Sequence, residues 1–234
     1  MMAIGEILMP QAAEPRNAWG ITRRNLGNLV GLAALFACAP LPLISEAMAQ
    51  DAMGGLAIEP VSLPDMALGP RNAPVTIVDY SSMTCSHCAA FMTNVFPMLR
   101  SKYIDSGWMR FVFREFPLDT KAAAASMLAR YIANDDSARY FGAIDTLFRQ
   151  QDQLIAQTSE TLQQVGRQFG MSQQAVETCL RDQALLDKIT VDQKIASDVV
   201  KIKATPTFFI NGQKNEGFIS FEAINSKVVS LLTK

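Results

Sequence analysis

Histidine is almost absent from this chain, because His87 is the only one among 234 residues. A metal site built on several histidines, or a reaction that needs two imidazoles, is therefore excluded. Charge of one sign is not in surplus either, with 21 basic residues against 22 acidic ones. Since binding to nucleic acid needs a basic surplus, the composition argues against such a partner. A hydrophobic share of 49% excludes a disordered tail protein and favours a globular one.

The N-terminal segment has the pattern of a secretory signal peptide. The pair Arg23-Arg24 precedes an uncharged stretch over residues 25–45, and a small-residue motif ends at Ala49. This pattern predicts export with cleavage after Ala49. Prolines shorten the apolar run below the roughly 20 residues of a membrane span, although a retained anchor remains the alternative. The arginine pair also resembles a twin-arginine signal, so the export route stays open.

The rest of the chain alternates between strand-like and helix-like segments. Residues 75–80 form a nearly continuous β-prone run, typical of a strand that is buried on both faces. Residues 109–113 alternate as a second strand. A helix is expected over residues 85–103, because apolar side chains recur there along one stripe. Residues 121–200 are helical in character throughout.

The C-terminal part predicts a hairpin and a last helix. A strand over residues 207–210 is followed by an Asn-Gly turn, which is a strong hairpin signal. The return strand is expected over residues 217–219 and the helix over residues 221–232. A short edge strand is also expected far upstream, near residues 56–58.

This order of segments predicts one α/β domain with a helical insert and no internal repeat. The signal peptide covers residues 1–49, and an N-terminal extension covers residues 50–69. The domain itself is expected over residues 70–234, with the helical insert at about 119–200.

Two cysteines, Cys85 and Cys88, lie where the buried strand ends and the helix begins. A helix N-terminus stabilises an anion, so we expect a lowered pKa and a thiolate at Cys85. The three-residue spacing puts Cys88 on the same helix face, close enough to close a disulfide. His87 can add positive charge or a hydrogen bond to the Cys85 sulfur. A stabilised thiolate makes the disulfide a strong oxidant, but a structural bridge and half of a metal site remain alternatives.

Two further features belong with these cysteines. Asp79 is a carboxyl group inside an apolar strand, six residues before Cys85. Because burial of a charge is costly, we expect a raised pKa and a role in exchanging the proton of Cys88, unless Asp79 is solvated at the strand edge. Pro206 stands directly before a strand, which leaves the backbone of Thr205 free to pair with an extended substrate chain. The sequence leaves open whether the Thr205–Pro206 bond is cis.

Together these features resemble the thioredoxin superfamily and, within it, the DsbA-like periplasmic thiol–disulfide oxidoreductases. The resemblance covers about residues 70–232, and the run over residues 110–118 also looks like this group. It implies a thioredoxin fold with an inserted helical subdomain. It also implies a role for each site residue: Cys85 attacks, Cys88 is the buried resolving cysteine, His87 stabilises the thiolate, Asp79 is the buried acid, and Thr205-Pro206 form the cis-proline loop.

The resemblance further implies a dithiol oxidase that donates its Cys85–Cys88 disulfide to reduced or unfolded exported proteins. A membrane quinone-linked partner of the DsbB type would reoxidise the pair, and the protein would be a monomer with no bound cofactor or metal. Ser86 departs from the best-known oxidases, which have proline there. Threonine before the cis-proline is also frequent in isomerase and reductase relatives, so the direction of electron flow stays open.

Two other functions remain as alternatives. A disulfide isomerase or reductase, kept reduced by a DsbD-type partner, usually oligomerises through an added N-terminal segment, and residues 50–69 are short for that purpose. A copper- or zinc-binding module would use Cys85, His87 and Cys88, but no second C-x-x-C completes a four-ligand site. Cys179 lies on an apolar helical stripe and is expected to be a buried free thiol, with a regulatory or partner-linked thiol as the alternative.

Overall fold

The computed structural model describes residues 60 and 62–233. The expected signal peptide and the short strand expected near residues 56–58 lie outside the described residues. No helix of the described part combines the length and the apolar character that crossing a bilayer requires.

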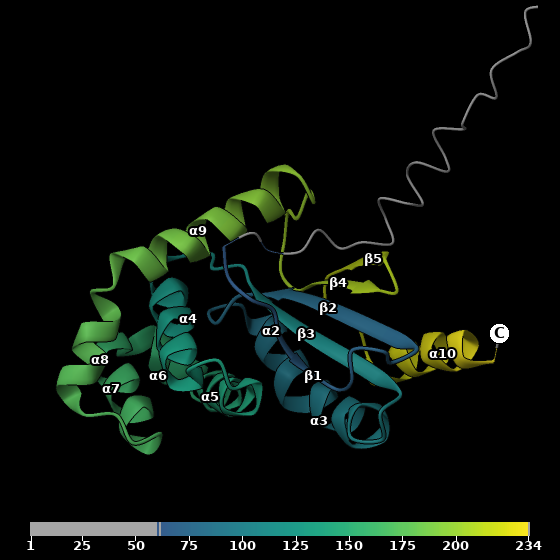
Figure 1. The fold of residues 1–234 in the computed structure, drawn as a ribbon, viewed down its shortest axis with the longest axis horizontal. Helices are drawn as coiled ribbons and strands as arrows, with labels where there is room; N and C mark the ends of the chain where they lie inside the picture. The colour runs from purple at the N-terminus through teal and green to yellow at the C-terminus, as the bar shows by residue number, and fades with distance from the viewer. Residues whose placement is uncertain (1–59, 61, 234) are drawn as a thin grey trace, which may run out of the picture. The chain divides into compact units, whose positions relative to one another are not determined.

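A five-stranded mixed sheet with the order β1-β3-β2-β4-β5 lies at the centre of the domain (Figure 1). Strands β2 and β3 pair in parallel, and the other neighbours are antiparallel. The strand predicted to be buried on both faces is the central β2, and its side chains are buried along almost its whole length, which confirms the prediction. The strands are β1 (Met66–Leu68), β2 (Val75–Ser81), β3 (Met109–Glu115), β4 (Thr207–Ile210) and β5 (Gln213–Glu216).

The helix predicted after β2 is present, but it contains two wider turns. Its consecutive parts are α2 (Ser86–Ala90), η1 (Phe91–Val95), α3 (Phe96–Leu99) and η2 (Arg100–Ile104). The η parts are π-helical turns on either side of Pro97, which has no N–H to continue the regular ladder. The irregularity begins one turn beyond the two cysteines.

Six helices between β3 and β4 form the insert and confirm the helical character predicted for residues 121–200. At the starts of α4, α5, α8 and α9 a side chain accepts a backbone N–H of the first turn, as Ser172 does at α8. The helices are α4 (Thr120–Ala133), α5 (Ser137–Arg149), α6 (Gln151–Ala156), α7 (Thr158–Gln168), α8 (Gln173–Leu180) and α9 (Gln183–Asp198).

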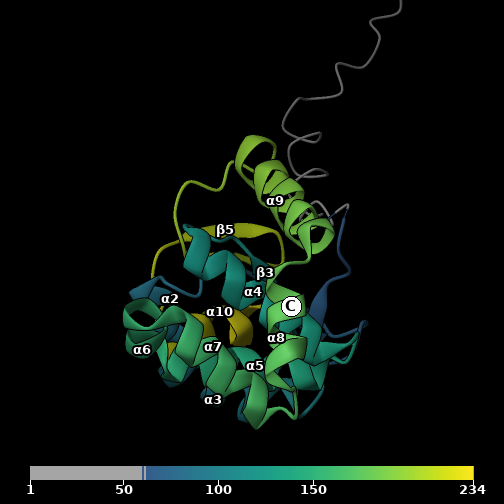
Figure 2. The same cartoon turned by 90° about the vertical axis from the view of Figure 1, so that its left-hand side faces the viewer.

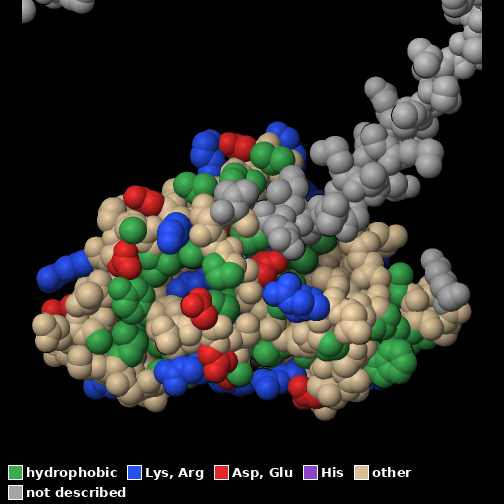
Figure 3. Space-filling model, in the orientation of Figure 1, with side chains coloured by type: hydrophobic (Ala, Val, Ile, Leu, Met, Phe, Trp, Pro, Cys, Tyr) green, Lys and Arg blue, Asp and Glu red, His purple; other side chains and the backbone are tan. Residues whose placement is uncertain are grey.

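The sheet is covered on both faces. One face packs against the helices that follow β2, against α4 and α5, and against the C-terminal helix α10 (Phe221–Leu232). The other face carries a smaller apolar cluster that includes Val78 and Ala196, so the end of α9 covers it. Figure 2 shows α9 on one side of the strands and α3 and α10 on the other. Figure 3 shows that acidic and basic side chains are interspersed on the visible face.

The return strand of the hairpin was predicted over residues 217–219, and this position is wrong, because β5 covers Gln213–Glu216. Asn211 and Gly212 form a two-residue turn in which both residues have positive φ, 45° and 82°. Pairing therefore resumes at once, with Ile210 opposite Gln213, and β5 ends before residue 217. β5 is an exposed polar edge strand, so it lacks the apolar pattern by which a strand is recognised. The last helix begins and ends where it was predicted.

Candidate active site

Cys85 is the N-cap residue of α2, at the end of the loop that follows β2. Its backbone is extended, with φ −83° and ψ 120°, and its sulfur accepts the backbone N–H of Cys88 at 3.4 Å. The sulfur is also 3.3 Å from the carbonyl oxygen of Thr205, which it reaches as a donor when protonated. The half-buried sulfur therefore lies between a helix N-terminus and the loop that precedes β4.

The surroundings of the Cys85 sulfur stabilise its anion and lower its pKa to about 5. The largest cause is a hydrogen bond from the Cys88 thiol, and partial burial opposes it. The side chain of Thr205 lowers the pKa of Cys85 further, and so do the backbone N–H groups of Cys88 and His87. At neutral pH this residue is therefore a thiolate in the reduced protein.

Cys88 has the opposite character, although it lies only one helical turn away. Its side chain is fully buried, and burial raises its pKa well above the ordinary value. The hydrogen bond that it donates to Cys85 and the nearby charge of Asp79 act in the same direction. The pair thus consists of one anion that is partly accessible and one protonated thiol that is shielded from solvent.

Asp79 lies in β2 and is fully buried, which excludes the alternative of a solvated strand edge. Burial raises the pKa of its carboxyl group to about 8, and the charge of Cys85 adds to this. The hydroxyl of Ser81, which donates to Oδ1 at 2.6 Å, works in the other direction. The side chain points to the same face of β2 as Ile77, which packs in one apolar cluster with Cys88.

The Thr205–Pro206 peptide bond is cis, a point that the sequence left open. The fold brings this loop to Cys85 across 120 residues of sequence. The Pro206 carbonyl accepts the N–H of Gly217, which fixes the loop to the segment after β5. Five of the six predicted site residues are therefore gathered in one place: Asp79, Cys85, Cys88, Thr205 and Pro206.

His87 is placed differently from the expectation. Its side chain is exposed to solvent, and the contact that stabilises the Cys85 sulfur is made by its backbone N–H. An exposed imidazole is screened by water, so its charge acts on the thiolate more weakly than the buried donors do.

Gln151 is a site residue that the sequence did not reveal. It is buried at the start of α6, and its amide nitrogen donates to the carbonyl oxygens of Met83 at 2.8 Å and of Cys85 at 3.0 Å. The helical insert therefore holds the loop that carries the nucleophile. A single glutamine within a long helical stretch carries no motif, and only its tertiary position distinguishes it.

Cys179 is buried and free, as expected from its apolar stripe in α8. Burial raises the pKa of this thiol to about 12, with a smaller contribution from Asp182, so it is protonated and unreactive at neutral pH. Among the residues that the structure describes, no three histidine, cysteine, aspartate or glutamate side chains gather into a metal-ligand set.

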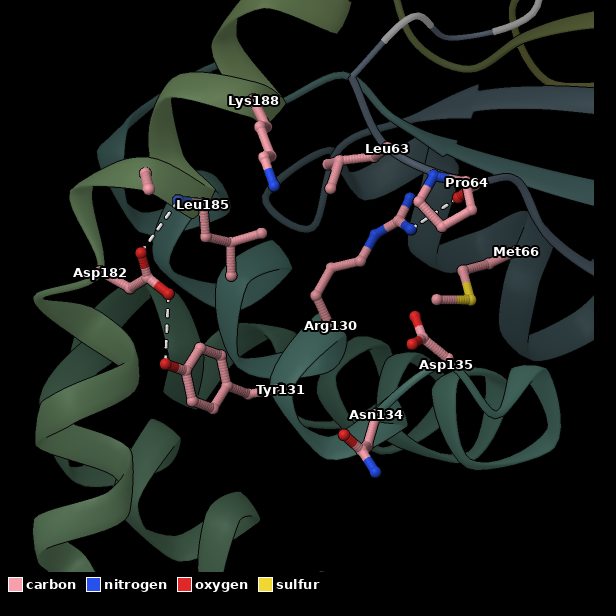
Figure 4. A pocket seen from close by; sticks show the side chains of 11 residues that line it. Leu63, Pro64, Met66, Arg130, Tyr131, Asn134, Asp135, Asp182, Leu185 and Lys188 are labelled. Atoms are coloured by element: carbon pink, nitrogen blue, oxygen red, sulfur yellow. Dashed lines mark hydrogen bonds between the residues drawn. The ribbon is translucent and has the colours of Figure 1, made fainter.

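A cavity of about 310 Å³ lies between α4, α9 and the segment that leads into β1 (Figure 4). Arg130, Tyr131, Asp182 and Lys188 are among its lining residues, and the Tyr131 hydroxyl donates to Asp182 at 3.2 Å. None of the predicted site residues lines this cavity. It is therefore separate from the cysteine site.

Comparison with known proteins agrees with this geometry. A family model described as thioredoxin matches residues 62–228. A protein of Rickettsia bellii, provisionally named a protein-disulfide oxidoreductase, is 31% identical over 70% of this chain and 63% of its own length. The crystal structure of Wolbachia pipientis alpha-DsbA1 matches at 32% identity with a TM-score of 0.68, over 73% of this chain and 92% of that one.

The chain therefore belongs to the thioredoxin superfamily, in the DsbA-like group of thiol–disulfide oxidoreductases. The predicted thioredoxin fold with a helical insertion is confirmed. BdbD of Bacillus subtilis, at 20% identity and a TM-score of 0.63, covers 73% of this chain and 94% of its own and shares the fold. The matches span 63% and 57% of the first two curated relatives, which is less than two thirds of their length.

Proposed function

We propose that this protein is a periplasmic dithiol oxidase that donates its Cys85–Cys88 disulfide to exported proteins with reduced thiols. The observation that carries the proposal is the contrast between the two cysteines. Stabilisation of the Cys85 thiolate exists only in the reduced form, because a disulfide sulfur bears no charge. At a pH above both the ordinary and the lowered pKa of Cys85, each unit by which the pKa is lowered favours the reduced form by about 1.4 kcal/mol. The disulfide is therefore a strong oxidant.

The reaction takes two exchange steps. A substrate thiolate attacks the Cys85 sulfur, the Cys85–Cys88 bond breaks, and Cys88 leaves as a thiolate that takes a proton from Asp79. A second substrate thiolate then attacks the substrate sulfur of the mixed disulfide and releases Cys85 as its stable thiolate. The substrate gains a disulfide and loses two electrons, which the two cysteines retain. No bound cofactor is required for this transfer.

The cis-proline loop provides the surface on which a substrate chain lies. Pro206 has no N–H, and its carbonyl accepts from Gly217, so the backbone of Thr205, whose carbonyl is next to the Cys85 sulfur, is the part of this loop that would pair with an extended peptide. Such pairing would present a substrate cysteine to Cys85 without demanding a particular side chain on either side.

Reoxidation requires a partner that accepts the two electrons, and we propose a membrane quinone-linked protein of the DsbB type. The Cys88 thiol resolves the mixed disulfide formed between Cys85 and that partner. Similarity to the disulfide bond formation protein D of Bacillus subtilis, 25% identical over 69% of this chain and 74% of its own length, supports a role in disulfide bond formation. The protein acts as a monomer in this proposal.

The equilibrium redox potential of the Cys85–Cys88 pair against glutathione tests the proposal. We expect a value nearer to the about −120 mV of a strong oxidase than to the about −270 mV of thioredoxin. A value near the lower figure would assign the protein to the reductases or isomerases instead. Cys85→Ser should abolish oxidation of a reduced substrate, whereas Cys88→Ser should accumulate mixed disulfides that are visible on a non-reducing gel.

A further inference from the structure

Ser81 is the last residue of β2, and its side chain is buried beside Asp79. Its hydroxyl donates to Oδ1 of Asp79 at 2.6 Å, within the usual range for a hydroxyl donor. Residues two apart in a strand point to the same face, so this contact follows from the strand geometry itself. One of the two carboxyl oxygens of Asp79 is therefore occupied.

The other oxygen, Oδ2, is buried and has no hydrogen-bond partner among the described residues. As long as the Ser81 hydroxyl donates to Oδ1, the proton of the neutral carboxyl group has no place on that oxygen. It is therefore carried by Oδ2. Asp79 is also close enough to Cys88 for its charge to act on that thiol.

We propose that Ser81 is a positioning residue for the resolving step: its hydroxyl holds Oδ1 of Asp79, so that Oδ2 alone exchanges the proton of Cys88. The inference rests on the proposed function. During reoxidation the Cys88 S–H bond breaks and its proton moves to Oδ2. The Cys88 thiolate then attacks Cys85 in the mixed disulfide, the Cys85–Cys88 bond forms, and the sulfur of the oxidising partner leaves as a thiolate.

The other groups that face Asp79 do not stabilise its anion. Cys85 at the N-cap of α2 and Cys88 within α2 face it: the charge of Cys85 raises the pKa of Asp79, and the charge of Asp79 raises the pKa of Cys88. Tyr140 faces it from α5, but the Tyr140 hydroxyl donates to Glu115, which is held by Arg130. None of the ion pairs of the described part includes Asp79. The Ser81 hydroxyl is therefore the donor that stabilises its anion.

The first test is the titration of Asp79 in the reduced protein, followed by carbon-13 NMR of its carboxyl group and assigned with Asp79→Asn. In Ser81→Ala the midpoint should rise by about one pH unit or more, because a hydrogen bond to the charged form is lost. Ser81→Thr keeps the hydroxyl and should return the midpoint to its original value.

The second test separates two kinetic steps in rapid mixing of the reduced protein with glutathione disulfide. Formation of the mixed disulfide needs only the Cys85 thiolate and should be unchanged in Ser81→Ala. Release of glutathione by Cys88 needs the Asp79 carboxylate, so at pH 7 it should slow about tenfold, with its pH profile moved upward. Ser126→Ala, which removes a buried hydroxyl from α4, should behave like the unaltered protein in both steps.

The outcomes are distinguishable. An unchanged Asp79 midpoint in a folded Ser81→Ala protein, or an equal slowing of both steps, would overturn the role of Ser81 and leave the oxidase intact. Failure of the unaltered protein to form any mixed disulfide would overturn the proposed function instead. If Ser81→Ala does not fold, the unaltered protein still decides: the Ser81 hydroxyl proton should exchange slowly, and its rapid exchange would refute the contact with Asp79.

Discussion

Two carboxyl groups are buried in neighbouring strands of the sheet, and they have different surroundings. Glu115 in β3 accepts hydrogen bonds from Arg130 through both of its oxygens and from the Tyr140 hydroxyl at 2.7 Å. Asp79 in β2 has the Ser81 hydroxyl as its hydrogen-bond donor and belongs to no ion pair of the described residues. Burial is common to both acids, and the counter-ion is not.

The comparison shows which property makes a buried acid useful for chemistry. A carboxylate with a guanidinium partner has its charge compensated, so Glu115 is a fixed link between β3 and helices α4 and α5. Asp79 has no such compensation, and burial raises its pKa to about 8, close enough to neutral pH for the group to gain and lose a proton. The same helical insert that compensates Glu115 thus leaves Asp79 available for the cysteines.

The largest effect should come from neutralising Asp79. Its pKa is about 8 in the folded protein and about 3.9 in an unfolded chain, so across that window the folded state holds a proton that the unfolded state has released. Stability therefore falls as pH rises through the window and levels off above it. Relative to reduced Asp79→Asn, the reduced unaltered protein should lose on the order of 5 kcal/mol between pH 4 and pH 9.

Urea unfolding of both reduced proteins at each pH measures this difference. The two cysteines of the site titrate in both proteins, so the difference between the two curves reports Asp79 together with its coupling to Cys85 and Cys88. A difference that does not change with pH would mean that Asp79 is ionised in the folded state, and the contrast with Glu115 would disappear.

Removal of the counter-ion of Glu115 should have the next largest effect. Arg130→Met should lower the free energy of unfolding by about 3–5 kcal/mol, because it leaves Glu115 buried and charged. Arg149→Met is the matched control: Arg149 is exposed in its pair with Asp145, and it should cost less than about 1 kcal/mol. Urea unfolding at pH 7 measures both. The double variant with Glu115→Gln should regain part of the loss, and a failure to do so would show that Arg130 acts by packing alone.

The sequence predicted the buried acid but not what distinguishes it. Asp79 was recognisable because it interrupts an apolar run, and Cys85 because a strand ends and a helix begins there. The partners of Glu115 come from helices far along the chain, and no local pattern pairs them. β5 was misplaced because an exposed edge strand needs no apolar alternation. Ser81 has no motif of its own, since a serine at a strand end equally suits a turn.

The insert also contacts the site through Gln151, whose amide satisfies two carbonyl groups of the loop before α2. Removing it leaves a buried polar group without a partner, and the expected effect is smaller than for a buried charge. Gln151→Ala would remove the amide donor from the buried Met83 carbonyl and one donor from that of Cys85, which also accepts the N–H of Ala89. We expect a loss of about 1–3 kcal/mol in the free energy of unfolding. Gln173→Ala, whose exposed amide bonds to Glu177, should change it little. Equal effects would mean that the insert does not support the loop.

The smallest effect should come from the residue that the sequence marked most strongly. His87 is exposed, so His87→Ala should raise the pKa of Cys85 only slightly, by less than about half a pH unit in the midpoint of thiolate absorbance. Cys88→Ala, which removes the largest stabilising donor, should raise it much more, and Cys88→Ser should raise it less than Cys88→Ala because a donor remains. If His87→Ala has the larger effect, solvent-exposed charge sets the reactivity of the thiolate. The buried donors would then not explain it, and the contrast between compensated and uncompensated groups would apply only inside the core.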